Sequence, residues 1–108
     1  MLKKSLSIIS ITLLFLVALS SNAEASVVTG KRYYTQLLKE PCGFKGDIMG
    51  SKHTKNAWRA FYKSGTLNTA IKEICPKAPD IISEKKQKHL YHFLESFASD
   101  SGNVPSCN

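Results

Sequence analysis

The sequence lacks the short motifs that mark the common enzyme classes. It has no G-x-S-x-G, no H-E-x-x-H and no glycine-rich loop that could cradle a phosphate. It also lacks a C-x-x-C, and its strand signals are poor, which argues against a thioredoxin-type redox enzyme. Cys42 and His53 form the one conceivable thiol and imidazole pair, without the context of a thiol protease. We therefore expect a protein that is not an enzyme.

Long apolar runs are also scarce, and the single one is too short to span a membrane. It covers residues 6–19, follows Lys3 and Lys4, and leads to Ala23-Glu24-Ala25, which together are typical of a secretory signal peptide. A membrane helix needs about 20 apolar residues, so we expect cleavage and no stable membrane insertion afterwards. The predicted signal peptide is 1–25 and the mature domain is 26–108. No cysteine follows the run to be acylated, so we predict a periplasmic or secreted protein.

Acidic residues are few, which leaves the domain basic. The chain has 15 Lys and Arg against 8 Asp and Glu, and removal of Lys3, Lys4 and Glu24 leaves 13 against 7, a net charge of +6. Such a charge would favour an acidic partner, such as an acidic redox protein or envelope component, whereas the dispersion of the lysines favours the interpretation of a solvated basic surface. Export makes nucleic acid an unsuitable target, and the lysines are spread along the chain rather than gathered in one basic block.

Cysteine is limited to three residues, all in the mature part: Cys42, Cys75 and Cys107. A domain of 83 residues has a small core and often relies on a disulfide or a cofactor. An odd number allows one intramolecular bridge, worth about 2 to 4 kcal/mol, and leaves one sulfur over. Because the polar tail 99–108 should need tying down, we expect Cys107 to be one partner; the other is left open between Cys42 and Cys75.

The apolar residues recur with helical spacing, and turn residues separate them into four segments. We predict helices over about 29–40, 54–64, 66–75 and 83–98. Pro41 and Gly43 should end the first, and Thr54, Thr66 and Ser83 should cap the others. The expected fold is a single all-α domain of about four helices, stabilised by a disulfide.

The three histidines differ in their context. His89 and His92 lie three residues apart on the predicted fourth helix and could share a face, but two ligands make a weak metal site, so we interpret them as a surface pair. His53 precedes the cap Thr54, and a helix N-terminus keeps an imidazole neutral and able to coordinate. We interpret His53 either as a loop residue that fixes the helix start or as a ligand.

Several segments resemble small exported class I c-type cytochromes, in particular the short cytochrome c-like proteins without a complete haem-attachment motif. Residues 37–43 (LLKEPCG) resemble the end of the cytochrome N-terminal helix, and residues 90–97 (LYHFLESF) resemble the closing helix that packs across it. Residues 52–54, Trp58, 74–76 and 98–107 add shorter matches. The likeness spans most of the mature chain.

This resemblance implies a cytochrome c-like helical arrangement and a role in haem binding or electron transfer. If Cys42 is matched to the first attachment cysteine, Lys45 and Gly46 stand where the second cysteine and the proximal histidine would be; if it is matched to the second, Gly43 takes the histidine position. The resemblance therefore implies haem iron held by a substitute such as His53 with Met49, and no other metal. The alternative is a non-enzymatic module that has discarded haem and binds an acidic protein or envelope partner through its basic face.

Overall fold

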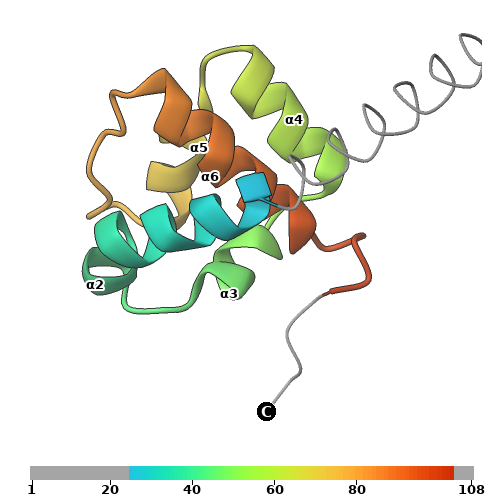
Figure 1. The fold of residues 1–108 in the computed structure, drawn as a ribbon, viewed down its shortest axis with the longest axis horizontal. Coiled ribbons are helices and arrows are strands. Elements are labelled where there is room, and N and C mark those ends of the chain that lie inside the picture. The colour runs from blue at the N-terminus through green and yellow to red at the C-terminus, as the bar shows by residue number, and fades with distance from the viewer. Residues whose placement is uncertain (1–24, 104–108) are drawn as a thin grey trace, which may run out of the picture.

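A computed structural model describes residues 25–103, and every regular element in that span is a helix. The elements in chain order are a helix over 25–37, α2 (Lys39–Cys42), α3 (Gly46–Gly50), α4 (Lys55–Lys63), α5 (Leu67–Ile74) and α6 (Glu84–Ser96). Figure 1 shows α6 running through the middle of the bundle with the other helices around it. The all-α prediction is confirmed, with six helices in the described span instead of about four. None of these six is long and apolar enough to cross a bilayer.

The first predicted helix is longer than its apolar pattern indicated. It is already helical at residue 25 and is interrupted only at Leu38, beyond which α2 follows. Helical hydrogen bonds flank the interruption, from the Leu38 amide to Tyr34 and from the Cys42 amide to Leu38. Pro41 does not end the helix as predicted, because it falls in the first turn of α2, where its missing N–H costs nothing. Gly43, with a φ of 77°, ends it.

α3 is the element that the sequence pattern did not reveal. No helix is predicted over Gly46–Gly50 from the sequence, and the glycine at each end weakens a helix locally. The glycines are there for packing: a Cβ on Gly46 would lie 2.3 Å from the Phe93 ring, and one on Gly50 would lie 2.7 Å from the carbonyl oxygen of Leu94. The close approach of α3 to α6 buries Met49 completely.

The predicted boundaries of α4 are confirmed, whereas one predicted cap of α5 is wrong. The Thr54 hydroxyl accepts the Ala57 amide at 3.1 Å, and Gly65, with a φ of 77°, follows the end of α4. Thr66 occupies the N-cap position of α5, but its side chain makes no capping hydrogen bond. Its hydroxyl instead lies 2.7 Å from that of Ser64, so it is committed to the preceding turn.

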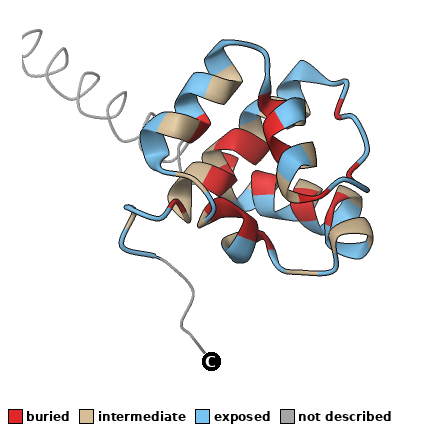
Figure 2. Ribbon diagram, turned by 180° about the vertical axis from the view of Figure 1, so that it is seen from behind, coloured by how far each residue is buried: buried red, intermediate tan, exposed pale blue. Residues whose placement is uncertain are grey.

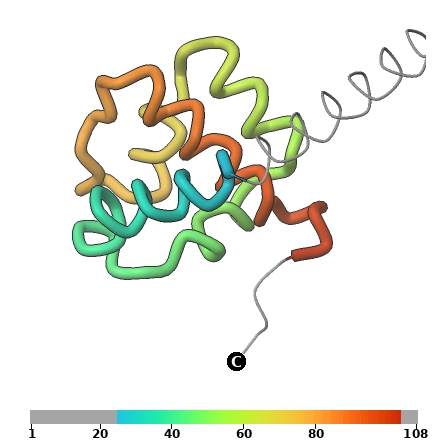
Figure 3. Tube along the Cα trace, in the orientation of Figure 1, coloured from blue at the N-terminus to red at the C-terminus, as the bar shows by residue number. Residues whose placement is uncertain are grey.

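α6 is the central helix of the domain, and its predicted cap Ser83 accepts the Lys86 amide. The N-terminal helix crosses it closely, as the trace in Figure 3 shows. Gly30 makes this crossing possible, since a Cβ there would lie 2.0 Å from the carbonyl oxygen of His89. Figure 2 shows the buried residues gathered in the middle of the bundle, and α6 contributes Leu90, Tyr91, Phe93 and Leu94 to them. The fully buried large side chains are Trp58, Tyr34, Leu38, Met49, Leu67, Ile71, Leu90 and Leu94.

The disulfide joins Cys42 to Cys75, across 33 positions of sequence. It joins the end of α2 to the residue that follows α5, so it links two elements that are far apart in the sequence. The prediction of a stabilising disulfide is confirmed. The expectation that the bridge includes Cys107 is wrong, because the other two cysteines pair with each other; Cys107 itself lies outside the described residues.

The beginning of the C-terminal tail is ordered without any help from a disulfide. The Asp100 carboxylate accepts the Lys55 amide at 2.9 Å, and the Ser99 amide donates to the His53 carbonyl at 3.0 Å. Residues 99–103 were expected to be too polar to order themselves. They are held because the start of α4 offers them free backbone groups.

Candidate functional site

The first residue tied to haem by the resemblance, Cys42, has no free thiol. Its sulfur is bonded to that of Cys75, and Cys75 is 4 % exposed. Covalent attachment of a c-type haem needs cysteine thiols that add to the haem vinyl groups, and a disulfide removes them. In this structure, Cys42 is a structural residue.

The place of the proximal histidine is filled by aromatic rings. Gly46, which takes this position in the match to cytochromes, is buried, and a Cβ there would lie 2.3 Å from Cε2 of Phe93 and 3.1 Å from Cδ1 of Tyr34. Phe93 is itself 3 % exposed. A ligand side chain and an iron atom have no room at Gly46. At Gly43, the histidine position of the other register, a Cβ would meet nothing within 4 Å, but Cys42 is still held in the disulfide, so the residues present do not fit a haem attached in the usual way.

The substitute ligands, Met49 and His53, lie in two different settings. Met49 is fully buried within the apolar core. The half-buried His53 ring meets Trp58 and Phe61 edge-on, with both ring centroids 4.9 Å away. The His53 carbonyl also accepts the Ser99 amide. These contacts support the interpretation of His53 as a residue that fixes the loop before α4.

His89 and His92 lie in different polar settings on α6. His89 Nδ1 lies 2.8 Å from the Ser26 hydroxyl, so this nitrogen already has a partner on the N-terminal helix. Burial lowers the pKa of His92. Among residues 25–103, no three His, Cys, Asp or Glu side chains come together as a metal site would require. Both rings are half-buried, which makes them less exposed than a surface pair.

The structure forms a groove between the N-terminal helix and α3, with a cavity volume of about 370 Å³. One wall comes from the N-terminal helix and α2, the other from residues 45–47, and the floor from Phe93 of α6 and from Phe97, which follows its last residue. A shallower hollow continues past Thr35, Lys39 and Lys45, which line both. This elongated depression is hereafter called the lysine groove.

Three lysines carry the charge of the groove: Lys31, Lys39 and Lys45. All three are exposed, and none of them forms an ion pair with a carboxylate of the described part of the chain. Asp47 is the one acidic residue that lines the more enclosed cavity, and Glu40 lines the shallower hollow. The Asp47 Oδ1 atom accepts the Ile48 amide at 2.9 Å. The more enclosed cavity therefore has an excess of unpaired positive charge.

A buried tyrosine holds the loop that leads into the groove. The Tyr34 hydroxyl donates to the Phe44 carbonyl at 2.8 Å, which fixes the turn just before Lys45. Burial raises the pKa of Tyr34 to about 12, and the carboxylate of Asp47 adds to the effect. Tyr34 is thus a neutral structural donor and positions Lys45 opposite Lys39.

None of the groove lysines was predicted as a site residue, although part of the signal is in the sequence. Lys31, Thr35 and Lys39 follow one another at intervals of four, so they share one face of a helix. Lys45 lies beyond a turn, and its place opposite this row depends on the fold. The sequence shows lysines dispersed along the chain, and the fold brings three of them to one groove.

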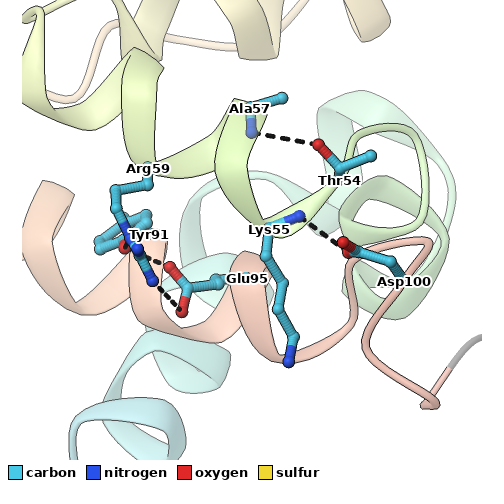
Figure 4. Close-up of polar contacts among 7 residues, drawn as sticks. All are labelled: Thr54, Lys55, Ala57, Arg59, Tyr91, Glu95 and Asp100. Carbon is cyan, nitrogen blue, oxygen red and sulfur yellow. Dashed lines mark hydrogen bonds and ion pairs between the residues drawn. The ribbon is translucent and has the colours of Figure 1, made fainter.

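A second polar cluster joins α4 to α6 on the surface (Figure 4). The Tyr91 hydroxyl donates to Glu95 and receives a long hydrogen bond from Arg59 Nε at 3.4 Å, and Arg59 also pairs with Glu95 at 3.8 Å. Burial raises the pKa of Tyr91, and its hydrogen bond to Glu95 adds to the rise. The Tyr62 ring stacks on Tyr91 with centroids 4.7 Å apart. Every charge in this cluster is internally matched, so its role is to hold two helices together.

Comparison of the chain with protein-family models, with curated proteins and with solved structures found no match. The geometry of the described residues is therefore the basis for a functional assignment.

Proposed function

We propose that this protein is a non-enzymatic binding module of the bacterial periplasm or of the secreted fraction, and that it holds an acidic partner in the lysine groove. The observation that carries the proposal is the groove itself, where Lys31, Lys39 and Lys45 line one cavity without a carboxylate partner of their own. Unpaired ammonium groups around a concave surface attract anionic ligands and orient them.

The arrangement favours this function over a haem-based one. The crossing of the N-terminal helix over α6 at Gly30 supports the expected likeness to a cytochrome frame. The groups that would hold haem are used for other purposes, with Cys42 in a disulfide and Phe93 packed against Gly46. We therefore propose a cytochrome-like frame that uses the surface between its first helix and α3 for binding.

The proposal is tested by titrating the oxidised mature protein into labelled poly-L-glutamate at salt concentrations from about 50 mM to about 500 mM, over which the Debye length shrinks severalfold. We expect saturable binding that weakens steadily with salt. The double variant Lys39→Glu/Lys45→Glu should lower the affinity by about a hundredfold, because it removes two charge-assisted contacts of about 1.5 kcal/mol each.

The matched control is Lys55→Glu/Lys63→Glu, which makes the same change in net charge at two exposed lysines of α4. This variant should bind nearly as well as the parent protein. An equal loss in both double variants would mean that only the overall charge matters, and it would remove the groove from the proposal. No binding by the parent protein at any salt concentration would refute the function.

Haem binding is checked separately on protein exported to a periplasm that has haem-attachment machinery. We expect a colourless protein whose mass is that of the signal-cleaved chain with one disulfide. A Soret band with added haem mass would contradict the role given to Cys42, and a band without added mass would show noncovalent haem.

A further inference from the structure

We infer that the lysine groove takes an extended peptide with the pattern acidic-x-apolar-x-acidic. This inference rests on the proposed function and names the chemistry of its partner. The two acidic side chains would meet Lys31 and Lys39, and the apolar side chain between them would enter the cavity above Phe97.

The spacing of Lys31 and Lys39 fits two acidic side chains of an extended peptide. Lys31 and Lys39 are eight positions apart, and helical hydrogen bonds continue on both sides of Leu38 between them. At 1.5 Å per residue, their separation along the helix axis is about 12 Å. An extended chain advances about 3.3 Å per residue, so residues four apart are about 13 Å apart and point to the same side. The separation of the two lysines along the helix therefore matches the distance between residues four apart in an extended peptide.

The part of the groove between the two lysines suits an apolar side chain. Midway between the lysines lies Thr35, whose hydroxyl donates to the Lys31 carbonyl at 3.0 Å and is thus used inside the helix. The aromatic rings of Phe93 and Phe97 line the same cavity, and Phe97 is half-buried. The cavity therefore offers apolar surface beside its charged side chains. The middle side chain of the peptide faces the same side as the two acidic ones, so an apolar residue suits it.

The far wall favours a peptide over a membrane surface or an anionic polysaccharide. Asp47 lines the cavity beside Lys45, and a carboxylate there would repel a rigid surface dense in phosphate or sulfate groups, whereas a flexible peptide can turn its acidic side chains away from it. A peptide backbone brings N–H donors, which a carboxylate accepts well. A concave site with an aromatic floor also gains little from a flat layer of headgroups.

The test uses two short labelled peptides of identical composition and measures fluorescence anisotropy against the oxidised mature protein. One has glutamates at its first and fifth positions with phenylalanine at the third; the other has glutamates at the first and third with phenylalanine at the fifth. We expect the first to bind about tenfold more tightly, since the permuted peptide loses one charge-assisted contact of about 1.5 kcal/mol. Vesicles rich in phosphatidylglycerol serve as the membrane probe.

A charge swap tests the contacts themselves. The variant Lys31→Glu/Lys39→Glu should lose the matched peptide and should bind the version in which both glutamates are lysines, whichever way the chain runs. Both positions are exposed, so the variant should fold, and circular dichroism verifies this.

The outcomes separate this inference from the function on which it rests. Equal binding of the two peptides, combined with a loss in Lys39→Glu/Lys45→Glu, would overturn the spacing rule and leave an acidic-ligand groove. Binding to vesicles without binding to either peptide would overturn the peptide and identify a membrane partner. Failure of the charge swap to restore binding would also overturn the inference. No binding to any of these probes or to poly-L-glutamate would refute both.

Discussion

At the scale of single residues, the missing side chain of Gly30 sets the distance between the N-terminal helix and α6. Because the nearest atom to a new Cβ is the His89 carbonyl oxygen at 2.0 Å, the neighbour cannot move aside without a backbone shift. We expect Gly30→Ala to lower the free energy of unfolding by about 1 to 3 kcal/mol, in spite of the better helix propensity of alanine. Urea unfolding measures this loss.

The control for Gly30→Ala is Gln36→Ala on an exposed position of the same helix. This substitution should change the free energy of unfolding by less than about 0.5 kcal/mol. Equal stability of the two variants would show that the helices do not cross at Gly30.

Tyr34 gives the fold a dependence on alkaline pH. Its pKa is about 12 in the folded protein against 10.0 ordinarily, so the unfolded chain loses this proton first. The stability from Tyr34 is complete below pH 10 and is lost as the pH rises from 10 to about 12. Tyr34→Phe should remove this part of the decline and cost about 1 kcal/mol at neutral pH, where the Phe44 carbonyl loses its donor.

Urea unfolding at a series of pH values from 7 to 12 measures both effects of Tyr34→Phe. The matched control is Tyr33→Phe, since the neighbouring hydroxyl makes no hydrogen bond within residues 25–103. An alkaline decline as steep in Tyr34→Phe as in the parent protein would contradict the assignment.

At the scale of elements, the start of α4 is capped from two sides. Thr54 accepts the Ala57 amide from within the helix, and Asp100 accepts the Lys55 amide from the C-terminal segment. We expect Asp100→Ala to lower the free energy of unfolding by about 0.5 to 2 kcal/mol, the usual cost of losing a cap. A thermal unfolding curve gives the change in midpoint.

The matched control for Asp100→Ala is Asp80→Ala, which removes another carboxylate by the same substitution. Asp80 forms an ion pair with Lys72, but both side chains are exposed, and such pairs contribute about 0 to 1 kcal/mol. The cap variant should therefore be the less stable of the two. The reverse order would show that the contact between Asp100 and Lys55 does not hold the tail.

The elements with a regular apolar pattern could be predicted from the sequence. The spacing of Leu90, Tyr91 and Leu94 reveals α6, and Thr54 and Gly65 mark the ends of α4. α3 could not be predicted, because its two glycines weaken a helix locally and are needed only where Phe93 and Leu94 come close. Residues that allow a close tertiary contact can thus have a low helix propensity, which hides the helix from a prediction based on the sequence alone.

At the scale of the whole molecule, one covalent link spans the domain. The bridge from Cys42 to Cys75 closes a long loop, and the double variant Cys42→Ala/Cys75→Ala should lose about 3 to 4 kcal/mol of unfolding free energy. Cys107→Ala should keep the bridge and nearly all of the stability. Non-reducing mass mapping and urea unfolding measure the two; loss of the bridge in Cys107→Ala would contradict the pairing.

Less of the candidate site than of the fold can be predicted from the sequence. Composition indicates a basic protein with one disulfide, but three cysteines allow several pairings, and only the packing of α2 against the residues after α5 selects one. The groove likewise needs Lys45 to face Lys39 across a turn fixed by Tyr34. Contacts between remote residues decide both features, and no short motif encodes them.

The chain contains a single tryptophan, and its burial gives the protein an intrinsic optical reporter. The Trp58 indole N–H donates to the Gly50 carbonyl at 2.8 Å, so the ring of α4 is hydrogen-bonded to the last residue of α3. Its fluorescence emission should be at short wavelength in the native protein and move to longer wavelength when α3 and α4 separate. The folding of the two helices that flank His53 can therefore be followed in a dilute solution of unlabelled protein by the fluorescence of Trp58.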